Sequence, residues 1–124
     1  MFIKMLNKTY KHIIWGKIKL KTFFGGVFIK KESLVEAQIY HPIKLEYYKR
    51  INEDEIVQNQ NAKYGISIVK TEYMPNNIKT ESKELKYLSN DENKIEKVLN
   101  ILKENEVTPI GVEDVISDLK SLLF

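Results

Sequence analysis

The spacing of the hydrophobic residues changes once along this chain, near residue 89. Between residues 43 and 88, apolar and polar residues alternate in most segments, a period of two that is typical of β-strands with one buried face. Beyond residue 89, apolar residues recur every three or four positions, which is the period of an amphipathic α-helix. A run of strands followed by a run of helices predicts an α+β fold in which helices cover a sheet.

Three strands are predicted in the alternating part of the chain, over residues 43–51, 63–74 and 78–88. Apolar residues on both faces make the second strand central, whereas charged residues on both faces of the third are typical of a protected edge. Residues 75–77, Pro-Asn-Asn, predict a turn, because proline fixes φ and asparagine tolerates the left-handed region. The prediction is a small antiparallel three-stranded β-meander.

Two helices are predicted after the strands, over residues 91–104 and 112–122. Ser89 and Glu92 match a capping box, in which each side chain satisfies a backbone N–H group of the other residue. The apolar residues of each helix fall on one stripe. Both helices are therefore expected to pack on one face of the sheet.

The N-terminal quarter differs from the rest of the chain in charge. Residues 1–31 contain eight lysines and no acidic residue, while residues 32–124 hold the other 12 basic residues and all 17 acidic residues. Such an asymmetry indicates two segments with different roles or origins. We therefore divide the chain into a basic N-terminal extension, residues 1–35, and a single α+β domain, residues 36–124.

Several interpretations of the basic extension stay open. The extension could be a strand that pairs with the domain, it could be a disordered tail, or it could be a stretch that is not natively translated. Where it is present, Lys17, Lys19 and Lys21 are candidate anion-binding residues for nucleic acid or for an anionic membrane surface. Its longest uncharged run, residues 22–29, has eight residues and is too short for a transmembrane segment, which takes roughly 20.

Few residues in this chain suit catalysis or metal binding. There is no cysteine, which excludes disulfides, thiolate metal sites and cysteine nucleophiles. The two histidines, His12 and His41, have no metal-ligand spacing to each other or to a carboxylate, and the five glycines form no phosphate-binding loop. We therefore predict a protein that is not an enzyme, with no catalytic residue, no metal site and no cofactor.

Tyrosines and a pair of aspartates are the candidate partner-binding residues. Tyr47, Tyr64 and Tyr73 lie on the predicted strands, and tyrosine is enriched at protein interfaces because it combines an apolar ring with a polar tip. Asp114 and Asp118 are four positions apart on the last predicted helix, so they share a face that suits a cationic partner. These residues predict a protein partner or a homo-oligomer.

Two stretches carry a resemblance to a known family: residues 64–68, with the sequence YGISI, and residues 107–119, with the sequence VTPIGVEDVISDL. They resemble a family of small uncharacterised proteins from clostridia and related Gram-positive anaerobes, defined by a domain of unknown function, over residues 43–123. The resemblance implies a small cytoplasmic bacterial protein. It implies no activity, ligand or catalytic residue.

These patterns favour a non-enzymatic protein-interaction or regulatory module. The alternative is a protein that binds nucleic acid or an anionic membrane surface through the lysine-rich extension. The two hypotheses predict different responses to salt, because binding that depends on lysine–phosphate contacts weakens as the salt concentration rises.

Overall fold

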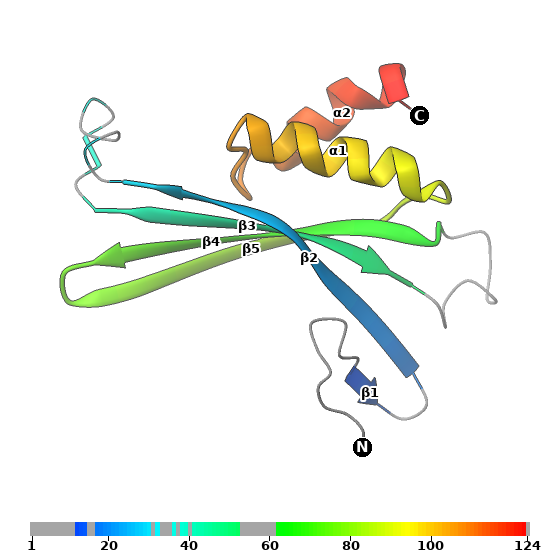
Figure 1. Cartoon of the computed structure of the whole chain (residues 1–124), viewed down its shortest axis with the longest axis horizontal. Helices are drawn as coiled ribbons and strands as arrows, with labels where there is room; N and C mark the ends of the chain where they lie inside the picture. Colours follow the sequence, from blue (N-terminus) through cyan, green and yellow to red (C-terminus); the bar gives the residue numbers. More distant parts are fainter. Residues whose placement is uncertain are drawn as a thin grey trace.

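The computed structural model describes residues 12–14, 17–30, 32, 36, 38–39, 41–52 and 62–123. In this part of the chain, two helices pack on one face of an antiparallel sheet (Figure 1), which confirms the predicted α+β fold with two C-terminal helices. The elements are β1 (His12–Ile14), β2 (Lys17–Ile29), β3 (Ile43–Ile51), β4 (Tyr64–Met74), β5 (Asn77–Ser89), α1 (Glu92–Glu104) and α2 (Val112–Leu123).

The strands follow one another across the sheet in the order β1-β2-β3-β4-β5, and every neighbouring pair is antiparallel. Strands β2 to β5 form a four-stranded body, and the short β1 pairs with the first three residues of β2. The prediction of three strands is therefore wrong. The fourth strand, β2, lies in the segment that was set apart for its charge, and it pairs with β3 from Leu20–Ile51 to Ile29–Ile43.

A β-bulge divides β2 into two parts. Phe23 pairs with Tyr48 and Gly25 pairs with Tyr47, so Phe24 is an extra residue in the register. An extra residue changes which alternate positions of a strand point to which face of the sheet. Phe24 packs against the core, whereas Phe23 is 45% exposed.

The hydrophobic core lies between the helices and the centre of the sheet. Alternate residues of β3 and β4 meet the apolar stripe of α1, and α2 adds two residues from its own stripe. Burying an aliphatic or aromatic side chain of this size contributes about 1.5–3 kcal/mol. The core residues are Ile43, Leu45, Tyr47, Ile66, Ile68, Ile95, Val98, Leu99, Leu102, Val107, Val112 and Ile116.

Tyr47 ties the connection between α1 and α2 to the sheet. Its hydroxyl donates a buried hydrogen bond of 2.8 Å to the carbonyl oxygen of Val107. Burial raises the pKa of Tyr47, and the negative charge of Glu106 raises it further, so the phenol stays protonated and keeps its role as donor. The ring of Tyr47 therefore packs in the core, and its hydroxyl fixes the connection between the helices.

The N-terminus of α1 differs in detail from the predicted capping box. Asp91 is the N-cap, and its Oδ1 accepts a 2.9 Å hydrogen bond from the backbone N–H of Asn93. Ser89 is the last residue of β5, and its Oγ instead accepts a 2.9 Å hydrogen bond from the backbone N–H of Asp91. The capping box with Ser89 as N-cap is therefore wrong, because the strand continues through Ser89 and the helix begins at Glu92.

Candidate functional site

The face of the sheet opposite the helices carries the candidate site, and we call it the open face. No element that the structure describes packs over it (Figure 1). The register places alternate residues of four strands on this face. They are Lys21, Phe23, Gly26, Phe28, Lys44, Glu46, Tyr48, Arg50, Ser67, Val69, Thr71, Tyr73, Ile78, Thr80, Ser82 and Glu84.

Among the described residues, two pairs of aromatic rings lie on the open face. The rings of Phe23 and Tyr48 meet edge to face, with centroids 5.6 Å apart and planes at 73°. The rings of Phe28 and Tyr73 lie 6.4 Å apart between centroids. Phe28 is 55% exposed and Ile78 is 63% exposed, so apolar surface on this face is open to solvent.

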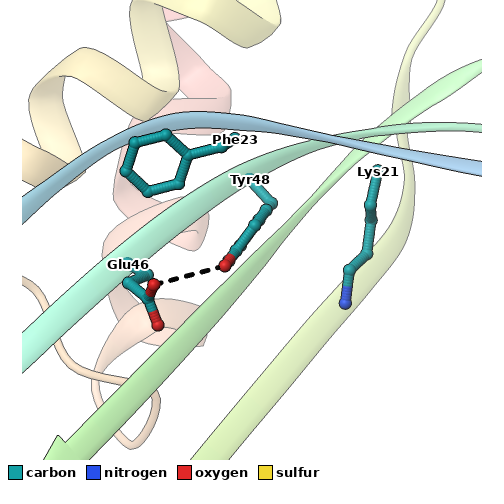
Figure 2. Close-up of a pocket in the computed structure, with 4 residues that line it drawn as sticks. All are labelled: Lys21, Phe23, Glu46 and Tyr48. Atoms are coloured by element: carbon teal, nitrogen blue, oxygen red, sulfur yellow. Dashed lines mark hydrogen bonds between the residues drawn. The ribbon is translucent and has the colours of Figure 1, made fainter. Parts of the chain in front are cut away.

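A hollow of about 300 Å³ lies beside the first aromatic pair and is lined by Lys21, Phe23, Glu46 and Tyr48 (Figure 2). The Tyr48 hydroxyl donates a long hydrogen bond of 3.4 Å to Oε2 of Glu46. The Nζ atom of Lys21 lies 5.3 Å from the centroid of the Tyr48 ring, a cation–π distance. Burial raises the pKa of Tyr48, and the charge and hydrogen bond of Glu46 raise it further, so the phenol is neutral near pH 7.

Cations and carboxylates on the open face lie close to one another. Glu84 is shared by two cations: its Oε2 is 3.6 Å from Lys21 Nζ, and its Oε1 is 3.5 Å from Arg50 Nη1. The Nζ atom of Lys44 lies 3.8 Å from Oε2 of Glu46. On this face three cations therefore share two carboxylates, and each cation lies within 4 Å of one of them.

Arg50 is the most buried charged residue of this face, with 4% of its surface exposed. Its Nε donates a 2.9 Å hydrogen bond to Oδ1 of Asn52, and Nδ2 of Asn52 donates a 2.6 Å hydrogen bond to the Lys86 carbonyl oxygen. These contacts join the end of β3 to β5 across β4. They hold the Arg50 guanidinium in place, and its ion pair with Glu84 in turn positions the Glu84 carboxylate.

Comparison with known proteins places the chain in a family. The model of a family of unknown function, DUF6514, matches residues 27–121. The chain belongs to this family. No curated protein and no solved structure matches the chain.

The match confirms that the chain belongs to a family of unknown function, and it includes the end of β2 as well as the stretch that carried the resemblance. Among the described residues of this DUF6514 protein, no group of three or more His, Asp or Glu side chains could hold a metal ion. None of its described helices is long and apolar enough to cross a membrane.

The three tyrosines proposed for partner binding occupy different places in this DUF6514 protein. Tyr47 is buried beneath the helices and bonded to Val107, so it has no surface to offer a partner. Tyr64 is half-buried and packs against the core. Of the three, Tyr73 alone lies on the open face, beside Phe28. The proposed role of Tyr73 stays a prediction.

The remaining predicted residues are also separated from one another. Asp114 and Asp118 are exposed on α2, which packs on the opposite face of the sheet from Tyr73. Lys17 and Lys19 lie in β2, where their backbones pair with Ile14 and His12, and their side chains lie outside the described part of the chain. Of the three predicted anion-binding lysines, only Lys21 can be placed on the open face, with its ammonium group near Glu84.

Phe23, Glu46 and Tyr48 form the hollow, and none of them was predicted as a site residue. Glu46 and Tyr48 occupy the polar positions of the β3 alternation, where they resemble ordinary exposed residues. Phe23 joins them only because β2 pairs with β3. The alternation of lysine with isoleucine and leucine over residues 17–21 supports one of the open interpretations of the extension, a strand that pairs with the domain, and β2 is that strand.

Proposed function

We propose that this chain is a non-enzymatic protein-interaction module that docks a partner polypeptide on the open face of its sheet, in the cytoplasm of a Gram-positive bacterium. One observation carries the proposal. The helices bury one face of the sheet, while the other face exposes Phe23, Phe28 and Ile78 in the described part of the chain. Removing aromatic and aliphatic surface of this kind from water is favourable, so its burial by a partner would stabilise the complex.

The balance of charge on the open face favours a polypeptide over a nucleic acid. Binding to a phosphate backbone draws on cations that are free to replace its counterions. The cations Lys21, Lys44 and Arg50 each lie within 4 Å of a carboxylate of the same face. A phosphate placed there would also meet Glu46 and Glu84. Mixed charges around exposed aromatic rings are instead typical of protein interfaces.

The protonation state of Tyr48 supports binding rather than proton transfer. Its pKa is raised by burial and by Glu46, so the phenol keeps its proton at neutral pH. A neutral phenol is a poor general base, and while its O–H bonds Glu46 its oxygen can still accept a hydrogen bond from a partner.

Nucleic acid or an anionic membrane surface is the competing ligand, and one observation favours it. Lys17, Lys19 and Lys21 occupy alternate positions of one strand, β2, and Phe23 follows them at the edge of the hollow. Lysines that lead to an aromatic ring are typical of single-strand binding sites. This alternative predicts binding that weakens steeply with salt and that disappears when the three lysines are replaced by glutamine.

Site-specific photocrosslinking in the natural host distinguishes these ligands. A photoreactive phenylalanine at Thr80 samples the open face, and the same residue at Lys94, a half-buried position of α1 away from the open face, is the control. We expect one discrete protein adduct from Thr80 and none from Lys94. The proposal is overturned by equal adducts from both positions, by none from Thr80, by an adduct that nuclease removes, or by a dimer of this chain alone.

Reconstitution with the crosslinked partner then tests the surface itself. Phe28→Ser removes a ring that is 55% exposed, and Ile110→Ser is the matched control, because Ile110 is 81% exposed in the connection between α1 and α2. Since both side chains are largely solvated, both variants should fold normally. We expect Phe28→Ser to weaken binding at least tenfold and Ile110→Ser to leave it unchanged. Equal effects of the two substitutions would exclude the open face as the docking surface.

A further inference from the structure

The hollow on the open face combines aromatic rings with a carboxylate that has few partners. Figure 2 shows Phe23 and Glu46 on one side of the Tyr48 ring and Lys21 on the other. The rings supply flat carbon surface, and Glu46 supplies negative charge at the edge of that surface. Such a site is complementary to a cation with a flat, weakly hydrated body.

Glu46 keeps most of its capacity to accept hydrogen bonds. A carboxylate has about four acceptor positions on its two oxygens. Among the described residues, Glu46 accepts one hydrogen bond, the 3.4 Å contact from the Tyr48 hydroxyl, and Lys44 Nζ stays 3.8 Å away. The Glu46 side chain is 24% exposed, so a donor from a partner can reach it.

The arrangement around Tyr48 already shows that its ring suits a cation. Lys21 Nζ lies 5.3 Å from the ring centroid, within the range of a cation–π contact. The charge of Lys21 is partly balanced by Glu84, 3.6 Å away. The Phe23 side of the ring, where Glu46 lies, is the side that remains for a second cation.

We propose that this hollow binds an arginine side chain that the partner polypeptide presents. The inference rests on the proposed function, and it adds the chemistry of the contact residue. The guanidinium group is planar, so it can stack on one of the two rings, whose planes meet at 73°, while it donates paired hydrogen bonds to Glu46. A hollow of about 300 Å³ has room for one side chain of this length.

Other side chains fit the hollow less well. A carboxylate or phosphate would face the charge of Glu46, and an aliphatic side chain would remove that carboxylate from water without replacing its hydrogen bonds. Lysine offers a compact, strongly hydrated ammonium that cannot stack and cannot donate a parallel pair of hydrogen bonds. Arginine is therefore the ligand that uses both the rings and the carboxylate.

The full chain and a pair of small probes provide the test. The probes are N-acetyl-arginine amide and N-acetyl-citrulline amide, which differ in the charge of the terminal planar group. Binding is followed by NMR, from the ring signals of Phe23 and Tyr48 and from backbone amides. We expect saturable shifts at these two rings with the arginine probe and at least tenfold weaker binding of the citrulline probe. Equal affinity for the two probes, or shifts confined to the acidic α2, would overturn the inference.

Two glutamate variants separate the hollow from general surface charge. Glu46→Gln removes the carboxylate and keeps the shape of the side chain, and Glu104→Gln makes the same change on the exposed surface of α1. We expect Glu46→Gln to remove the preference for arginine over citrulline, with the amide spectrum of the rest of the sheet unchanged. Glu104→Gln should bind as the unaltered chain does. A preference that persists in Glu46→Gln would show that Glu46 does not recognise the cation.

The two proposals can fail independently. If Thr80 captures a partner and the arginine probe shows no binding, the open face docks a polypeptide through other chemistry and the arginine site is excluded. If the arginine probe binds as expected and Thr80 captures no protein, the hollow recognises guanidinium groups and the interaction function is excluded.

Discussion

Gly65→Ala is expected to destabilise the fold strongly, because the backbone of β5 leaves no room for a side chain at this position. A Cβ atom on Gly65 would lie 2.2 Å from the carbonyl oxygen of Lys86 and 2.3 Å from that of Leu85. Both are backbone atoms, so no rotamer change can relieve the contact. The close approach follows from the register shift between β4 and β5 next to Gly65.

The size of the effect follows from two costs. To restore a contact of at least 3.0 Å, the Lys86 oxygen must move by about 0.8 Å. This oxygen accepts the 2.6 Å hydrogen bond from Asn52, and losing a largely buried bond of this kind costs about 1–3 kcal/mol. Shifting a packed strand costs about 1–3 kcal/mol more. We therefore expect a loss of about 4 kcal/mol, a large part of the roughly 5–15 kcal/mol of a small domain.

Urea unfolding followed by circular dichroism at 222 nm measures this loss. With a slope of about 2 kcal/mol/M, the midpoint should fall by about 2 M. Gly111→Ala is the matched control, because nothing lies within 4 Å of a Cβ at that position. The control should change stability by no more than about 1 kcal/mol, in the stabilising direction. If the two variants unfold at the same urea concentration, the close approach of β5 to Gly65 does not exist in solution.

Two further predictions concern the core and the pH dependence of stability. Leu99→Asp buries an unpaired charge in the apolar stripe of α1 and should abolish the cooperative urea transition. The control, Asn100→Asp at the exposed neighbouring position, should change the free energy of unfolding by no more than about 0.5 kcal/mol. A cooperative urea transition of the Leu99→Asp variant would contradict the packing of α1. The hydrogen bond from Lys70 lowers the pKa of Glu72 below its ordinary value of 4.5 in spite of burial, with help from His41, so this carboxylate stabilises the fold above that pH. This stabilisation should be lost as the pH falls through the lowered pKa of Glu72 in the folded state. Urea midpoints measured from pH 7 to 3 should therefore depend less on pH in Glu72→Gln than in the unaltered chain. The same pH dependence in both proteins would exclude this contribution of Glu72.

Local patterns were sufficient to predict β3, β4, β5, α1 and α2. Each of these elements has a clear hydrophobic period, so the interactions that define it lie within a few residues along the chain. The turn at residues 75–77 was also predicted nearly in place, since β4 ends at Met74 and β5 begins at Asn77. Short stretches of sequence were therefore enough to locate most of the elements.

The pairings between distant residues could not be predicted in the same way. Tyr47 was proposed to face a partner, and its hydroxyl instead bonds Val107, 60 residues along the chain. Arg50 and Glu84 likewise meet only when β3, β4 and β5 are aligned in their final register. A single-residue change in register would move every side chain of a strand to the other face. The sequence of a strand alone therefore does not show whether a tyrosine lies on the buried face or on the exposed face of the sheet.

The bulge in β2 explains why the hollow was invisible in the sequence. Without an extra residue, Phe23 would share a face with Val27 and Ile29, since all three positions are odd and side chains of a strand alternate. The bulge at Phe24 reverses the phase, so Val27 and Ile29 pack against the core while Phe23 lies beside Tyr48 on the open face. The same phase change therefore completes the core on one side of the sheet and builds the aromatic wall of the hollow on the other.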